Sequence, residues 1–157
     1  QIDVQSQRRL SLRYFFASQG MLEQLKPPVP DRSVVKGMHT VLVVEDSVAQ
    51  REMIKTLLEG SGLSVTAVSN GFDALKYIQG NPPDLILLDI VMPEMNGYEV
   101  CRRIKSDNTT KSLPVVMCSA KGEEFDRYWG MKQGADAYIA KPFQPTELVG
   151  TVKLLLG

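Results

Sequence analysis

The fold is decided by the stretch Asp84-Leu85-Ile86-Leu87-Leu88-Asp89. Its four aliphatic residues are consecutive and do not alternate with polar residues, so the strand that they predict is buried on both faces. Strands of this kind lie at the centre of parallel sheets that helices cover on both sides. The acid at position 89 therefore stands at the carboxyl end of a central strand.

Similar aliphatic runs recur along the chain, and each is followed by a segment with helical spacing. Five such units predict an α/β fold, a doubly wound five-stranded parallel sheet with helices on both faces. The predicted strands are 41–44, 63–68, 85–88, 115–118 and 137–140. The predicted helices begin after Ser47, Asn70 and Asn96, at Phe125 and at Pro145. The side chains expected to face the sheet from the first helix are those of Met53, Ile54, Leu57 and Leu58.

Composition and charge exclude several classes of function. The 157 residues carry a formal net charge of +0, and residues 1–37 hold six basic and three acidic groups, hence +3 against −3 for the remainder. A strongly basic footprint for nucleic acid is missing, and no apolar run approaches the ~20 residues that span a bilayer. We therefore expect a cytoplasmic protein whose partners include neither nucleic acid nor a membrane. The two cysteines, Cys101 and Cys118, are expected to be buried thiols rather than metal ligands or a disulfide.

Three prolines in four positions, Pro27, Pro28 and Pro30, interrupt the chain before the first strand. They forbid a continuous helix and favour an extended linker. We therefore divide the chain into an N-terminal extension, 1–37, and a globular domain, 38–157. Within the extension, Leu10 to Lys26 is either a short amphipathic helix or a loosely docked or poorly ordered segment, and the extension is alternatively part of an upstream domain.

Polar side chains follow the ends of four predicted strands. Glu45 and Asp46 follow the first strand, Asp89 the third, Ser119 the fourth and Lys141 the fifth. The carboxyl ends of parallel strands share one edge of the sheet, and ligands of open α/β sheets bind there. We expect these five side chains to converge on one site.

The combination of these residue types points to phosphoryl transfer. Neighbouring carboxylates repel each other unless a cation neutralises them. A hard divalent cation, most naturally Mg²⁺, and the ammonium of Lys141 can do this, while the Ser119 hydroxyl can donate to a phosphoryl oxygen. Asp89 would then be the nucleophile.

Four pieces of sequence carry a resemblance to a known family. They are Val41-Leu42-Val43-Val44-Glu45-Asp46-Ser47, Asp84-Leu85-Ile86-Leu87-Leu88-Asp89-Ile90-Val91-Met92-Pro93-Glu94-Met95-Asn96-Gly97, Ser119-Ala120 and Tyr138-Ile139-Ala140-Lys141-Pro142-Phe143. With these pieces, residues 39–157 closely resemble the receiver domain of bacterial two-component response regulators, the CheY-like family. The resemblance implies the flavodoxin-like strand order 2-1-3-4-5.

The resemblance also implies an acceptor and a metal pocket. Asp89 resembles the phosphoacceptor, which would take its phosphoryl group from a CheA-like histidine kinase. Mg²⁺, or alternatively Mn²⁺, would be held by Glu45, Asp46, Asp89 and the main-chain carbonyl of Val91. Glu45 stands where many relatives have aspartate, and a glutamate there often acts through water.

Three further residues resemble the parts of a phosphorylation switch. Lys141 resembles the lysine that pairs with the phosphoryl group, and its bond to Pro142 is expected to be cis. Ser119 and Tyr138 resemble the switch pair, in which the hydroxyl moves to the phosphoryl oxygen and the ring turns inward. The implied output surface comprises the fourth helix, the fifth strand and the fifth helix.

Three aromatic residues, Phe125, Tyr128 and Trp129, fall within five positions of the predicted helix 125–133. They cannot all face one way, so we expect at least one to pack inward and at least one to be exposed to a partner. The segment from Ser119 to Thr146 resembles the PilH type of stand-alone receiver, from chemosensory systems that control type IV pili and motility.

The favoured interpretation is a stand-alone receiver that signals by protein–protein contact and is not an enzyme in the usual sense. After Lys141 sixteen residues remain, room for one helix and no effector domain. The alternatives are a phosphate sink for a companion receiver and a receiver fragment of a larger, for example DNA-binding, regulator. A phosphatase of the haloacid dehalogenase type is disfavoured, because position 91 is valine where that mechanism needs a second aspartate.

Overall fold

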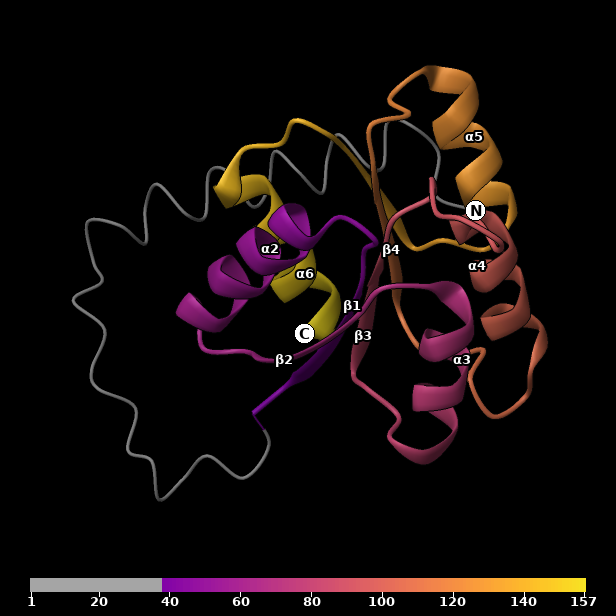
Figure 1. Ribbon diagram of the computed structural model, residues 1–157, viewed down its shortest axis with the longest axis horizontal. Coiled ribbons are helices and arrows are strands. Elements are labelled where there is room, and N and C mark those ends of the chain that lie inside the picture. Colours follow the sequence, from indigo (N-terminus) through magenta and orange to yellow (C-terminus); the bar gives the residue numbers. More distant parts are fainter. Residues whose placement is uncertain (1–37) are drawn as a thin grey trace.

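A five-stranded parallel sheet forms the middle layer of the structure (Figure 1). The computed structural model describes residues 38–157. The order of the strands is β2-β1-β3-β4-β5, and every neighbouring pair is parallel. Both findings confirm the predicted fold. The strands are β1 (Thr40–Val44), β2 (Ser64–Val68), β3 (Leu85–Leu88), β4 (Val115–Ser119) and β5 (Ala137–Ala140).

Helices cover both faces of this sheet. They are α2 (Val48–Gly60), α3 (Gly71–Gly80), α4 (Gly97–Ser106), α5 (Glu124–Lys132) and α6 (Pro145–Leu156). Figure 1 shows α2 and α6 on one side of the sheet and α3, α4 and α5 on the other. The predicted caps are confirmed, because the side chains of Ser47, Asn70 and Asn96 each accept a hydrogen bond from a first-turn amide of the helix that follows.

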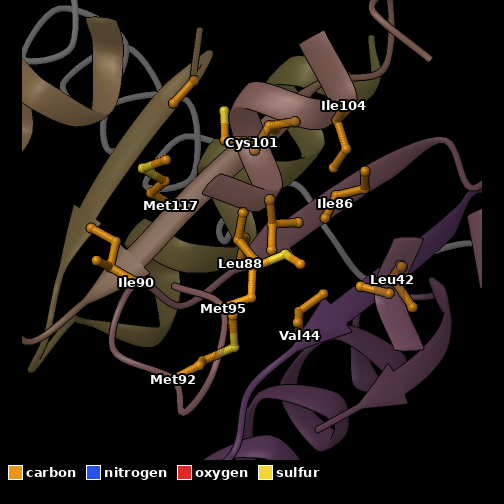
Figure 2. Packing of buried hydrophobic residues seen from close by; sticks show 14 of the residues in the cluster. Leu42, Val44, Ile86, Leu88, Ile90, Met92, Met95, Cys101, Ile104 and Met117 are labelled. Carbon is orange, nitrogen blue, oxygen red and sulfur yellow. The ribbon is translucent and has the colours of Figure 1, made fainter. Parts of the chain in front are cut away.

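The central strand β3 belongs to two separate cores. All four of its residues are buried. Leu85 and Leu87 pack with side chains of α2 and α6, whereas Ile86 and Leu88 pack with those of α3 and α4. Figure 2 shows this second cluster, with Cys101 and Ile104 of α4 beside the strand residues. Side chains of a strand alternate between its two faces, so a strand between two helical layers must be apolar throughout.

One part of the predicted packing is wrong. Met53 is 44% exposed, whereas Ile54 and Leu58 are buried. Ile54 and Leu58 are four residues apart and therefore lie on one stripe of α2, which faces the sheet. Met53 is one residue earlier, about 100° around the helix, and so points away from that stripe.

Two further expectations from the sequence concern the N-terminal extension and membrane-spanning helices. The extension 1–37, with its possible helix from Leu10 to Lys26, lies outside the described residues. Among residues 38–157, no helix has both the length and the apolar character needed to cross a membrane.

Both cysteines are buried, as expected. Burial raises the pKa of the Cys101 and Cys118 thiols to about 12. Because the thiolate is the reactive form, we expect neither cysteine of the native protein to react with an aromatic disulfide reagent at pH 8. Both should react at once in guanidinium chloride. Rapid titration of either thiol in the native protein would contradict the burial.

Candidate functional site

The three predicted acids lie together at the carboxyl edge of the sheet. Val44 and Leu88 are register partners on the adjacent strands β1 and β3, so the residues that follow them are neighbours. The Asp89 amide donates to the Val44 carbonyl at 3.0 Å. One carboxylate oxygen from each of Glu45, Asp46 and Asp89 lies within 4.8 Å of the others. Glu45 and Asp89 are buried, whereas Asp46 is exposed.

Lys141 reaches this acid cluster from the end of β5. Its Nζ lies 2.6 Å from Glu45 Oε2 and 3.6 Å from Asp89 Oδ2. The Lys141–Pro142 bond is cis, as predicted. The structure therefore brings the lysine to the acceptor candidate, although its shorter contact is with Glu45.

The two buried carboxylates differ in how they are held. Glu45 Oε1 accepts a hydrogen bond from the Ser47 amide at 3.2 Å, and its Oε2 accepts from Lys141. Asp89 Oδ1 accepts from the Ile90 amide at 2.7 Å, which leaves Oδ2 facing the lysine at the longer distance. Both oxygens of Glu45 are thus bonded to protein donors.

Burial and neighbouring charges shift the protonation of this cluster. Burial, together with repulsion from Asp89, raises the pKa of the Glu45 carboxyl, despite the opposing bonds from Lys141 and Ser47. Burial alone would lower the pKa of Lys141, but the hydrogen bond to Glu45 and the charge of Asp89 outweigh it, and the pKa of the ammonium is raised. The lysine therefore remains a cation in the site.

The donor set suits a hard cation. All three acids offer oxygen ligands, which Mg²⁺ and Mn²⁺ prefer. Three carboxylates and one ammonium leave a formal charge of about −2, which a divalent cation would cancel. Val91, two residues after Asp89, has an exposed side chain, and the role of its carbonyl stays a prediction.

Arg51 supports the site in a way that the sequence did not indicate. This side chain, on α2, donates from Nη1 to the Glu45 carbonyl at 2.9 Å and to the Asp46 carbonyl at 3.5 Å. It thereby holds the loop that carries the two acids. The only available signal was an arginine in the first turns of the helix that follows the acids.

The predicted switch residues, Ser119 and Tyr138, meet at Lys121. Ser119 is buried at the end of β4, and its Oγ accepts from the Lys121 amide at 3.3 Å. Tyr138 is 4% exposed, so its ring lies inward, and its hydroxyl donates to the Lys121 carbonyl. Burial raises the pKa of Tyr138, which keeps the phenol a donor. Both residues thus contact the loop between β4 and α5.

The aromatic side chains of α5 are all exposed: Phe125 by 71%, Tyr128 by 53% and Trp129 by 45%. The expectation that at least one is exposed is confirmed, and the expectation that one packs inward is wrong. The inward position is taken by Gly130, where an added Cβ would lie 2.8 Å from Met117 Sδ. The Phe125 and Trp129 rings stack on each other instead, with centroids 6.5 Å apart.

A glycine joins α4 to the backbone of the acceptor candidate. The Gly97 amide donates to the Ile90 carbonyl at 2.9 Å. A Cβ at position 97 would lie 2.1 Å from the Asp89 carbonyl oxygen and 2.8 Å from Ile90 Cα. Because these atoms are main chain, no rotamer change could make room, and α4 can begin here only with glycine.

Comparisons with known proteins find one family model, described as response regulator receiver domain, which matches residues 41–153. Two relatives come from Pseudomonas aeruginosa. The phosphate regulon transcriptional regulatory protein PhoB is 44% identical over 117 residues, which are 74% of this chain and 51% of PhoB. Protein PilG is 42% identical over 113 residues, which are 72% of this chain and 84% of PilG. The chain thus spans about half the length of PhoB and most of PilG.

Solved structures show the same likeness. The crystal structure of a putative response regulator from Chloroflexus aurantiacus matches with a TM-score of 0.74 and 38% identity, over 76% of this chain and 98% of that one. The chemotaxis response regulator CheY4 of Vibrio cholerae matches with a TM-score of 0.71 and 29% identity, over 76% of this chain and 99% of that one.

The contact at Gly97 generates a stability test. We expect Gly97→Ala to lower the free energy of unfolding by about 2 kcal/mol or more, because the added methyl group overlaps main-chain atoms. Gly60→Ala, where nothing lies within 4 Å of the added Cβ, is the matched control and should be neutral or slightly stabilising. Urea denaturation measures both, and equal midpoints would contradict the close approach.

The raised pKa of Glu45 generates a pH test. A group whose pKa is higher in the folded state stabilises the fold fully below its usual value of 4.5, and this stabilisation is lost as the pH rises through the raised pKa. Glu45→Gln is neutral at every pH. We therefore expect the melting temperature of Glu45→Gln minus that of the wild type to become more positive as the pH rises from 4.5 to neutrality. The measurement is made in the presence of a chelator.

The control for this pH test is Glu52→Gln, an exposed acid on α2. It removes one exposed carboxylate and leaves the buried acid cluster unchanged, so a pH-dependent difference seen only in Glu45→Gln would point to the cluster. A Glu45→Gln difference that is constant or falls as the pH rises would show that burial does not disfavour the charged carboxylate.

Proposed function

Because the chain belongs to the response regulator receiver family, we propose that it accepts a phosphoryl group on Asp89 in a two-component phosphorelay. One observation supports this most strongly. Glu45, Asp46 and Asp89 present oxygens within 4.8 Å of one another, and Lys141 Nζ lies 3.6 Å from Asp89 Oδ2. A buried carboxylate that can act as nucleophile, next to a lysine ammonium and two further acids able to bind a metal ion, is the arrangement that phosphoryl transfer requires.

The donor would be a phosphohistidine of a CheA-like histidine kinase. An Asp89 carboxylate oxygen attacks the phosphorus, a P–O bond forms, and the P–N bond breaks with its electron pair returning to the imidazole. Asp89 Oδ2 is the oxygen for this attack, because Oδ1 is bonded to the Ile90 amide. The product is an acyl phosphate, which water would slowly hydrolyse to the free carboxylate and phosphate.

Asp46, Asp89 and the Val91 carbonyl would hold Mg²⁺, with Mn²⁺ as an alternative. Bound there, the cation would offset the charge of the phosphoryl oxygens. Glu45 would act on it through water, as a glutamate at this position of the family often does. Its two oxygens also accept bonds from the Ser47 amide and Lys141.

Lys141 and Ser119 would stabilise the transferred group. The ammonium can follow the negative charge from the carboxylate to a phosphoryl oxygen, since it already lies between the two buried acids. The Ser119 hydroxyl would donate to a second phosphoryl oxygen. The chain would thus catalyse only its own phosphorylation and slow dephosphorylation.

The output surface would be formed by α5, β5 and α6. A phosphoryl group that draws Ser119 toward Asp89 would shift the loop at Lys121, which Tyr138 also contacts, and so shift a pre-existing equilibrium. The exposed rings of Phe125 and Trp129 on α5 are suited to an output protein, because aromatic side chains dominate binding energy at interfaces.

The pathway and the architecture of the whole protein belong to the proposal as well. The matched region is 84% of PilG, which favours a short receiver that acts in pilus or motility control. Such a protein would consist of a receiver domain at 38–157 and an extension at 1–37. The matched region is 51% of PhoB, which favours the alternative of a receiver within a longer regulator. A phosphate sink would need the same Asp89 chemistry and no output partner.

The direct test is phosphorylation by acetyl phosphate with Mg²⁺, followed by intact-mass measurement. We expect the gain of one phosphoryl group by the wild type and none by Asp89→Asn or after chelation of the metal. Asp73→Asn, an exposed aspartate on α3, is the matched control and should gain the group normally. Phosphorylation of the Asp89→Asn variant would show that the acceptor lies elsewhere.

A further inference from the structure

Helix α5 buries few of its own residues. Among its nine residues, all of which the structure describes, Gly130 alone is buried, and no side chain caps its first turn. By comparison, α4 buries four residues and is capped by Asn96. An element with so little buried apolar surface is among the first to move in a folded domain. Met131 packs, partly buried, against the core, and polar contacts from neighbouring elements add to what holds α5 in place.

Two tyrosines from different elements supply contacts to the start of α5. Tyr138, on β5, donates to the Lys121 carbonyl in the preceding loop, and the Arg127 guanidinium lies over its ring, 5.6 Å from the centroid. Tyr98, on α4, donates from its hydroxyl to the Asp126 carbonyl at 3.3 Å. Burial and the charge of Asp126 raise the pKa of Tyr98, so its phenol stays protonated and able to donate.

Tyr98 is also tied to the phosphorylation site, through the residue before it. The Gly97 amide bonds to the Ile90 carbonyl, and position 97 has no space for a Cβ against the Asp89 carbonyl. A shift of the main chain at Asp89 must therefore displace the first turn of α4. Tyr98 lies in that turn, one residue after the contact.

We propose that Tyr98 is a positioning residue that couples the Asp89 backbone to α5, along a route separate from Ser119 and Tyr138. The inference rests on the proposed function. The Tyr98–Asp126 bond occurs together with the inward ring of Tyr138, and both hold the start of the same helix. The bond therefore stabilises the arrangement in which the ring lies inward, the one expected to favour the phosphoryl group. It acts through the position of α5 and touches no reacting atom.

The experiment compares Tyr98→Phe with wild type, using beryllofluoride and Mg²⁺ as the phosphoryl analogue. Trp129, the chain's single tryptophan, lies on α5 and reports binding by its fluorescence. Losing one neutral hydrogen bond from the favoured arrangement should raise the half-saturating beryllofluoride concentration about two- to tenfold. Amide hydrogen exchange in residues 124–132 should accelerate over a similar range.

The matched control is Tyr77→Phe. Tyr77 is also half-buried, and its hydroxyl bonds to Thr66 Oγ1 at 3.1 Å, between α3 and β2. This variant loses a comparable bond remote from α5, so it should leave beryllofluoride affinity and exchange in α5 unchanged. The comparison separates coupling from a general loss of stability.

The outcomes distinguish the inference from the proposed function. Weaker binding and faster α5 exchange in Tyr98→Phe alone would support the coupling. Unchanged or tighter binding in Tyr98→Phe, or equal weakening in both variants, would overturn it while the receiver function stands. A wild type that binds no beryllofluoride and gains no phosphoryl group would overturn the proposed function and this inference with it.

Discussion

The ammonium of Lys141 lies between two buried carboxylates, and the rest of the site depends on this arrangement. Glu45 and Asp89 are neighbours because β1 and β3 are parallel and in register, so their repulsion is built into the sheet. The lysine offsets part of it, 2.6 Å from Glu45 and 3.6 Å from Asp89. The acid cluster still carries excess negative charge, which suits the site to a divalent cation. Such a cation would in turn offset the charge of an incoming phosphoryl group.

Rigidity is distributed unevenly around this cluster. The central strands are buried on both faces, and Gly97 fixes α4 against the Asp89 backbone. Helix α5, by contrast, buries only Gly130 among its fully described residues and carries exposed aromatic rings. A rigid site beside a helix that buries little of its own surface is a combination that would let a local charge change become a shift in population.

Much of the fold and site could be predicted from the sequence, because the signals are local. Unbroken aliphatic runs marked the buried strands, and Asn96 marked the start of α4 through its capping bond. The acids, Ser119 and Lys141 could be grouped into one candidate site because each lies at, or just after, the carboxyl end of a strand. Met53 was misplaced because the core buries Ile54 and Leu58 of α2 fully and Leu57 only partly, and a one-residue offset in helical phase is hard to read from sequence.

The sequence by itself determined the order of strands and helices, the edge at which the acids gather, and the residue types available there. Only the tertiary structure decided that Lys141 is closer to Glu45 than to Asp89, across 96 positions, and that Tyr98 bonds to the Asp126 carbonyl, across 28. Only the tertiary structure showed that Gly130 takes the inward position on α5, so that all three aromatic rings of this helix are exposed. Such contacts depend on small differences in the distances between packed elements, and local patterns of residue type do not encode these differences.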